Sequence, residues 1–95
     1  MSKSEFDIGR AKSLIEEISA NLAELPQDSA KYAQLRAEVE DLKTMLGKAG
    51  AEIPQIEDRM KSVHGLFDRG ASELRADGVR VGMFLSEIGR MLGLD

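Results

Sequence analysis

The stretch Ile8-Gly-Arg-Ala-Lys-Ser-Leu-Ile-Glu-Glu-Ile-Ser-Ala-Asn-Leu-Ala-Glu-Leu25 decides the fold class of this chain. Its apolar residues recur at intervals of 3 and 4, at Ile8, Ala11, Ile15, Ile18, Leu22 and Leu25. This is the heptad spacing of a helix that packs lengthwise on a partner, whereas a strand would alternate every second residue. Ser4 with Asp7 resembles a cap, and Pro26 forbids continuation, so we expect a helix from about Glu5 to Glu24.

The same spacing returns beyond Pro26 and predicts a second helix. Its apolar positions are Tyr32, Leu35, Val39, Leu42 and Leu46. Asp28 or Ser29 can cap the start of this helix, and Gly47 and Gly50 end it.

The two predicted helices can pair along their apolar seams if the chain folds back around Pro26. In that arrangement Ile18 contacts Val39, and Ile15 contacts Leu42. We therefore predict an antiparallel helical hairpin over residues 5–46.

Residues 47–53 form a glycine-containing hinge within one domain, and Pro54 suits the first turn of a third helix. The third seam keeps the same intervals and consists of Ile53, Ile56, Met60, Val63, Phe67, Gly70 and Leu74. This spacing lets the helix continue through Gly65 and Gly70, although each Gly costs about 0.8–1 kcal/mol relative to Ala. A break near Gly70 is the alternative.

Asp77-Gly78 is a turn signal, and Asp77 could cap a fourth helix that Gly93 ends. The apolar face of this helix consists of Val81, Phe84, Leu85, Ile88, Met91 and Leu92. The third and fourth helices predict a second hairpin over residues 54–92. The fold class is therefore all-α: a small antiparallel bundle of two helical hairpins with about four helices, formed by residues 1–95 as a single domain.

The fourth helix has more apolar surface than one partner helix can cover. Val79 and Met83 point roughly away from its main face, and Gly82, Ser86 and Gly89 form a third face of small residues that another backbone can approach closely. We predict that these five residues form an interaction surface, covered by the first hairpin or by a second chain in a homodimer.

Composition argues against several classes of function. The chain has 13 Lys and Arg against 17 Asp and Glu, a net charge of −4 that opposes binding to nucleic acid. It has no Cys, which excludes disulfides and thiolate sites. The longest apolar run, Met83-Phe-Leu, is far too short to cross a bilayer, and the first residues do not resemble a secretory signal. We expect a cytoplasmic protein with no nucleic-acid or membrane partner.

The sequence does not predict a catalytic site. The single histidine, His64, precedes Asp68 by four residues, so the two can meet on one helical face, but they are too few ligands for a tight metal site. Two-metal bundles use Glu-x-x-His pairs, and the residue three before His64 is Lys61. We therefore expect no enzyme, no metal site and no cofactor.

Two segments resemble a known family. Leu74-Arg-Ala-Asp-Gly-Val-Arg-Val-Gly-Met-Phe-Leu-Ser-Glu-Ile-Gly-Arg-Met-Leu-Gly-Leu94 is similar to the closing helix of the short bacterial proteins called domain of unknown function 4404, and Leu14-Ile-Glu-Glu-Ile-Ser-Ala-Asn-Leu22 resembles their first helix. A His-Pro step of that family is replaced here by Asp77-Gly78. The resemblance implies no activity.

Three hypotheses for function remain after these exclusions. The first is a non-catalytic helical interaction or scaffold protein that self-associates. The second is a small chaperone or adaptor that binds a client helix in an apolar groove lined by Met83 and Val79. The third is a metal or small-ligand binder that uses His64.

Overall fold

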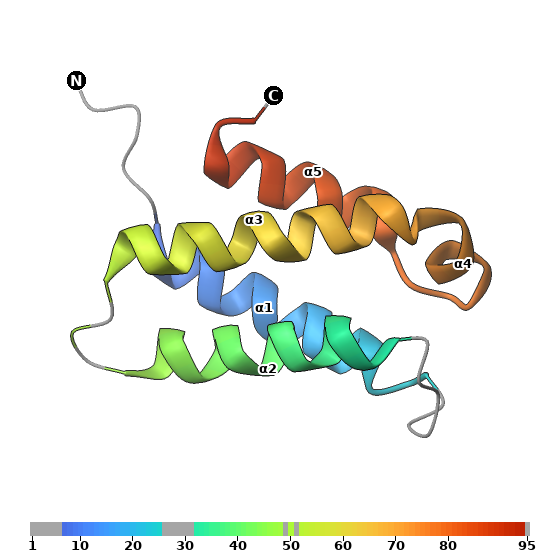
Figure 1. Cartoon of the computed structure of the whole chain (residues 1–95), viewed down its shortest axis with the longest axis horizontal. Helices are drawn as coiled ribbons and strands as arrows, with labels where there is room; N and C mark the ends of the chain where they lie inside the picture. Colours follow the sequence, from blue (N-terminus) through green and yellow to red (C-terminus); the bar gives the residue numbers. More distant parts are fainter. Residues whose placement is uncertain (1–6, 26–31, 49, 51, 95) are drawn as a thin grey trace.

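The computed structural model describes residues 7–25, 32–48, 50 and 52–94. Within these residues the chain forms helices and no strand (Figure 1). The helices are α1 (Ile8–Leu22), α2 (Ala33–Gly47), α3 (Ile53–Arg69), the short α4 (Ala71–Ala76) and α5 (Val81–Leu92). The predicted all-α class is confirmed.

The four longer helices form an antiparallel bundle with up-down-up-down order (Figure 1). Along the chain α1 packs against α2, α2 against α3 and α3 against α5, and α5 returns to meet α1 over a smaller contact. The short α4 lies across one end of the bundle, where it joins α3 to α5. The two predicted hairpins therefore lie side by side and share one core.

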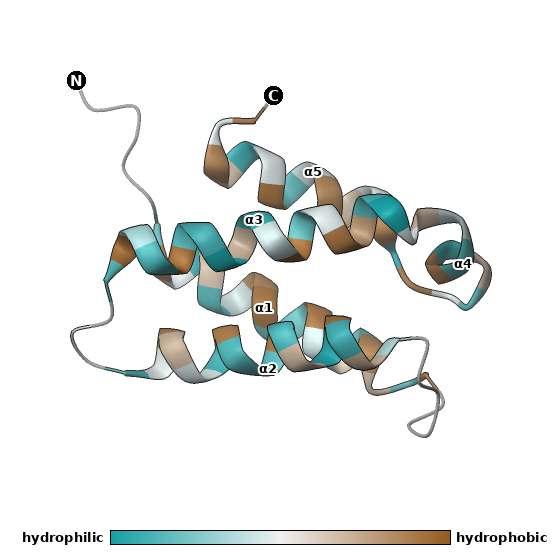
Figure 2. Cartoon of the chain, viewed as in Figure 1, coloured by the Kyte–Doolittle hydropathy of each residue, from teal (hydrophilic) through white to brown (hydrophobic). Residues whose placement is uncertain are grey.

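The core is built from the predicted seams. Figure 2 shows apolar and polar segments alternating along each long helix, the pattern of helices that bury one stripe. Every seam residue of α2 and most of those of α1 and α3 are buried, whereas Ile53 at the start of α3 is 40% exposed. At the centre the rings of Phe67 on α3 and Phe84 on α5 lie 5.7 Å apart and tilted.

The start of α1 differs from the prediction. Asp7 has an extended backbone, and its side chain accepts a hydrogen bond from the backbone nitrogen of Arg10 at 3.1 Å. Asp7 is therefore the N-cap, and the helix begins at Ile8 instead of near Glu5, because the carboxylate satisfies an N–H group that the helix itself leaves free. Ser4 lies outside the described residues.

The second helix begins at Ala33, directly after Tyr32. Asp28 and Ser29, the predicted caps, lie outside the described residues, as do Ala49 and Ala51 of the predicted hinge. The predicted position of Pro54 in the first turn of α3 is confirmed.

The continuous third helix is wrong, and the alternative break at Gly70 is confirmed. Helix α3 ends at Arg69, and α4 turns away from its axis (Figure 1). Gly78 then ends α4 with φ at +96°, a left-handed conformation that favours glycine. The backbone nitrogens of Val79 and Gly78 donate to the carbonyls of Leu74 and Arg75, which completes a Schellman motif.

Asp77 does not cap α5. The helix begins at Val81, and Arg80 precedes it as the N-cap residue without a side-chain cap. Instead, the backbone nitrogen of Arg80 donates to Oδ1 of Asn21, a buried residue of α1, at 3.1 Å. The start of α5 is thus fixed by a side chain from another helix. The predicted end at Gly93 is confirmed, with φ at +71°.

Candidate functional site

The smaller contact between α1 and α5 leaves an open groove of about 550 Å³. The residues that line it are Asp7, Gly9, Arg10, Ser13, Leu14, Glu17, Met83, Glu87 and Met91. The two methionines come from α5 and Leu14 from α1, so thioether and aliphatic groups lie between charged side chains. This α1–α5 groove contains Met83, one of the five residues of the predicted interaction surface.

Core packing decides which side of α5 faces the groove. Val81, Phe84 and Ile88 are each no more than 1% exposed, and together they anchor one side of the helix. Met83 must then point outward, and its side chain is 39% exposed. Met91 lies at the edge of the core and is half-buried.

The predicted interaction surface is only partly exposed. Met83, Gly82 and Ser86 are exposed, as predicted for a surface that a partner can reach. Val79 is 3% exposed and belongs to the core, and Gly89 is buried as well. Val79 precedes the first turn of α5, so its side chain does not follow the helical wheel and is covered within the chain, which is one of the two predicted alternatives.

Ion pairs join α5 to α1 beside the groove. Nη2 of Arg10 lies 3.0 Å from Oε1 of Glu87, whose other oxygen lies 3.5 Å from Arg90. Arg80 at the start of α5 lies 3.3 Å from Glu17 of α1 and 5.8 Å from the centre of the Phe84 ring. Because these pairs are largely exposed, they contribute little to the free energy of unfolding. Their effect is to orient charges around the groove.

Sequence reasoning missed the α1 side of this groove. Arg10 and Glu87 are 77 positions apart, and periodicity within one helix carries no signal for such a contact. Met91 was assigned to the core face, whereas it also lines the groove. An available signal was the polar edge of α1, where Arg10, Ser13 and Glu17 follow helical intervals of 3 and 4.

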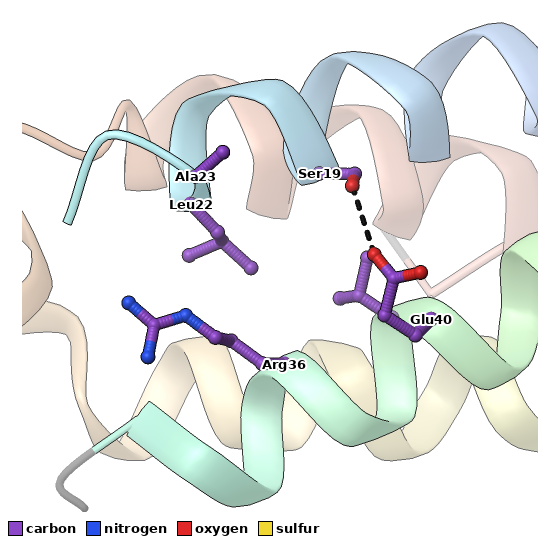
Figure 3. A pocket seen from close by; sticks show the side chains of 6 residues that line it. Ser19, Leu22, Ala23, Arg36 and Glu40 are labelled. Carbon is purple, nitrogen blue, oxygen red and sulfur yellow. Dashed lines mark hydrogen bonds between the residues drawn. The ribbon is translucent and has the colours of Figure 1, made fainter. Parts of the chain in front are cut away.

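A smaller hollow of about 240 Å³ lies between α1 and α2 (Figure 3). Its lining residues are Ser19, Leu22, Ala23, Arg36, Val39 and Glu40. Figure 3 shows the Glu40 carboxylate pointing to the Ser19 hydroxyl, which donates a hydrogen bond of 3.1 Å to it. Lys43 lies 3.5 Å from the same hydroxyl and 3.8 Å from Glu40. These exposed contacts join the two helices.

A third set of ion pairs joins α2 to α3. Arg59 of α3 lies 3.1 Å from Glu38 and 3.0 Å from Asp41, both on α2. The hydrogen bond to Glu38, followed by the charges of both carboxylates, raises the pKa of Arg59 above its already high usual value. Arg59 therefore stays charged, and its ion pairs with Glu38 and Asp41 link α3 to α2.

His64 and Asp68 lie on α3, where His64 is half-buried and Asp68 is exposed. Among the described residues, no group of three or more His, Cys, Asp or Glu side chains is arranged to hold a metal ion. None of the described helices has the length and apolar character needed to cross a membrane.

Comparisons with protein-family models, with curated proteins and with solved structures gave no match. The resemblance to domain of unknown function 4404 therefore stays a prediction.

Proposed function

We propose that this protein is a non-catalytic interaction protein that self-associates as a homodimer through the outer face of α5 and serves as a small helical scaffold in the cytoplasm. The observation that carries the proposal is the position of Met83. Its side chain lines the α1–α5 groove and is 39% exposed, although Val81, Phe84 and Ile88 on the other side of the same helix are buried.

The open shape and mixed lining of the groove favour contact with a helix over binding of a small molecule. It is open along two helices and mixes apolar and charged residues, whereas small-molecule sites are enclosed and bury most of their ligand. Methionine has a flexible, polarizable side chain that adapts to apolar partner surfaces. Covering Met83 and Met91 with a second helix would remove apolar surface from water, at about 25 cal/mol per Å².

A client helix is the second candidate occupant. The pair of methionines favours it, because adaptable methionines recur in grooves that bind amphipathic helices of varied sequence. Val79 does not belong to such a groove, since it is buried. Self-association is preferred because the outer side of α5 presents a carboxylate and a guanidinium side by side, Glu87 and Arg90, so a second copy can meet it with opposite charges.

Met83→Asp tests the proposal. Since Met83 is partly exposed and on the outer side of α5, the variant should fold as the wild type does, with unchanged helical circular dichroism. A carboxylate buried in an interface without a partner costs several kcal/mol, so light scattering should show that the dimer has become a monomer.

Ser62→Asp is the matched control. Ser62 is exposed on α3, and no residue of α3 lines the groove, so the same carboxylate is introduced outside it. This variant should remain dimeric. If Met83→Asp stays dimeric, or if the wild type is a monomer throughout the concentration range, self-association through this face is wrong. In the second case, binding of an added amphipathic helix would support the client hypothesis.

A further inference from the structure

The joint between α3 and α4 consists of one residue, Gly70, since α3 ends at Arg69 and α4 begins at Ala71. Gly70 has φ at −102° and ψ at +17°, whereas a residue inside an α-helix has about −63° and −42°. Two backbone hydrogen bonds already cross the joint, from Gly70 to the carbonyl of Leu66 at 3.1 Å and from Leu74 to the carbonyl of Gly70 at 2.9 Å. Both have the four-residue spacing of an α-helix, so a modest rotation at Gly70 would make α3 and α4 one straight helix.

The local sequence favours the straight form. Phe67, Gly70 and Leu74 keep the intervals of 3 and 4 that run along α3, so the apolar stripe continues across the joint without a slip. The residues of α4, Ala-Ser-Glu-Leu-Arg-Ala, are mostly strong helix formers. The bend at Gly70 therefore has its cause outside the segment itself.

Two apolar side chains hold the bent segment against the end of the bundle (Figure 1). Leu74 is 1% exposed and Val79 is 3% exposed, so both belong to the core. A straight helix would continue along the axis of α3 and carry both residues away from this position. The burial of these two side chains therefore opposes straightening.

Two hydrogen bonds from the same segment reach the first hairpin. Asp77 accepts from the hydroxyl of Tyr32 at the start of α2, and the backbone nitrogen of Arg80 donates to Oδ1 of Asn21 on α1 at 3.1 Å. Both bonds join residues far apart in the sequence, and both must break when α4 moves. The bent form is thus held by tertiary contacts against the local preference for a straight helix.

We propose that residues 70–80 form a strap that opens by straightening at Gly70, so that α3 and α4 become one continuous helix while the long helices keep their packing. Opening exposes Leu74 and Val79 to water and frees the start of α5 from α1. Because local sequence and tertiary contacts favour different conformations of one segment, the strap is a two-state element. Its opening does not depend on the proposed self-association.

An open strap can still reach α5. Phe67 lies against Phe84, and α3 and α5 are antiparallel, so Gly70 is level with Val81. In the straight helix Ala76 would lie about 9 Å beyond Gly70, at about 1.5 Å per residue, and neighbouring helices lie about 8–10 Å apart. The gap from Ala76 to Val81 is then roughly 13 Å, and the connection between them spans about 16 Å when extended at about 3.3 Å per residue. Helix α5 can therefore stay on α3 while the strap is open.

Hydrogen exchange of the wild-type chain distinguishes straightening from unfolding of α4. In the open form the amide of Arg80 loses its acceptor on α1, whereas the amide of Leu74 keeps its helical acceptor at Gly70. The protection factor of Arg80, measured by NMR, should therefore be at least about tenfold lower than that of Leu74. If Leu74 exchanges as readily as Arg80, α4 unfolds instead of straightening, and the proposal is wrong.

Thiol labelling measures the opening directly, since the chain contains no cysteine of its own. Val79→Cys places a thiol of similar size under the strap, and Val39→Cys places one in the core at a residue of α2 that is 1% exposed. Val79→Cys should react at least about tenfold faster and with a weaker dependence on urea, because opening of the strap exposes less surface than global unfolding. Equal rates with equal urea dependence would mean that the strap moves only when the whole protein unfolds, which overturns the proposal.

Alanine at the joint tests the structure of the open form. In the Val79→Cys background, Gly70→Ala favours the straight helix and should speed labelling about four- to fivefold. The bent form still accepts this alanine, because its Cβ would meet the Leu66 carbonyl oxygen at 3.4 Å, an ordinary contact. Gly65→Ala is the matched control, since residue 65 is inside α3 in both forms and the labelling rate should not change. An unchanged rate with Gly70→Ala, or an equal increase with Gly65→Ala, would overturn the proposed straightening.

Discussion

The hydroxyl of Tyr32, at the start of α2, donates a hydrogen bond to Oδ2 of Asp77 at the end of α4. Tyr32 is 5% exposed, so its ring is part of the core, while its hydroxyl oxygen reaches Asp77 at the end of α4. Burial, followed by the hydrogen bond and negative charge of Asp77, raises the pKa of Tyr32 to about 12. The contact ties the first hairpin to the segment that leads into α5.

The raised pKa predicts a loss of stability in alkaline solution. A tyrosine in an unfolded chain titrates near about 10, so the stability that Tyr32 contributes is fully present below that pH and is lost as the pH rises through about 12. Tyr32→Phe removes the phenol and its titration. It should be less stable than the wild type at pH 8, by about 0.5–1.5 kcal/mol for the lost hydrogen bond.

The decisive measurement is the difference in the free energy of unfolding between the wild type and Tyr32→Phe. Urea unfolding gives this difference at each pH from about 8 to 11.5. This difference should shrink with rising pH, because only the wild type has a phenol to ionise in this position. Titration of the lysines affects both proteins alike and cancels. A difference that stays constant over this range would contradict the shifted pKa of Tyr32.

The contact of Phe67 with Phe84 predicts a large effect of truncation. Both residues are 0% exposed, and Phe67→Ala should cost about 3–5 kcal/mol, because it removes transfer free energy and leaves a cavity. Since a whole domain is stable by only about 5–15 kcal/mol, the thermal midpoint should fall steeply. The control is Ile53→Ala at a residue 40% exposed, which should change stability by about 0.5 kcal/mol or less.

Two glycines should respond in opposite directions to alanine. Gly65 lies inside α3, and an added Cβ would meet only Nη1 of Arg69 at 3.8 Å, so Gly65→Ala should raise stability by about 0.8–1 kcal/mol through helix propensity. Gly78 has φ at +96°, which alanine adopts only with strain, and Gly78→Ala should destabilise the protein by more than that gain. Chemical denaturation of both variants measures whether each substitution raises or lowers the free energy of unfolding. Changes of the same sign would refute the assigned backbone conformations.

The cap of α1 is testable by a conservative pair of variants. Asp7→Ala removes the acceptor for the backbone nitrogen of Arg10 and should cost about 0.5–2 kcal/mol. Asp7→Asn keeps an oxygen in the same position and should cost much less, since asparagine caps helices about as well. If both variants lose the same stability in thermal unfolding, the contribution of Asp7 comes from its charge at the helix terminus and not from the hydrogen bond.

Much of the architecture was predictable because its causes are local. The intervals of 3 and 4 identified all four long helices, and most of the predicted apolar positions are buried, although Leu85, Met91 and Leu92 of α5 are only half-buried. Pro54 in the first turn of α3 and the ends at Gly78 and Gly93 follow from restrictions on φ that each residue carries with it. The individual pairs Ile18 with Val39 and Ile15 with Leu42 stay predictions, although all four residues are buried where α1 meets α2.

The candidate site was only partly predictable. Met83 could be identified because a helical wheel shows which residues a core face leaves over. The same reasoning does not apply to Val79, since α5 begins at Val81, three residues later than a cap at Asp77 implies, and the helical wheel does not hold before that point. Its place in the core depends on how the connection from α4 folds.

The amino-acid sequence by itself therefore determined that four long segments are helical, which stripe of each is apolar and that Gly93 ends the last helix, because these properties depend on neighbours within a few residues; it left the break at Gly70 open. Only the tertiary structure decided that Asn21 of α1 holds the start of α5, that Arg10 meets Glu87 and that the bundle leaves its groove between α1 and α5. Those contacts join residues 59 and 77 positions apart. They arise from how four apolar stripes share one core, which no single helix specifies.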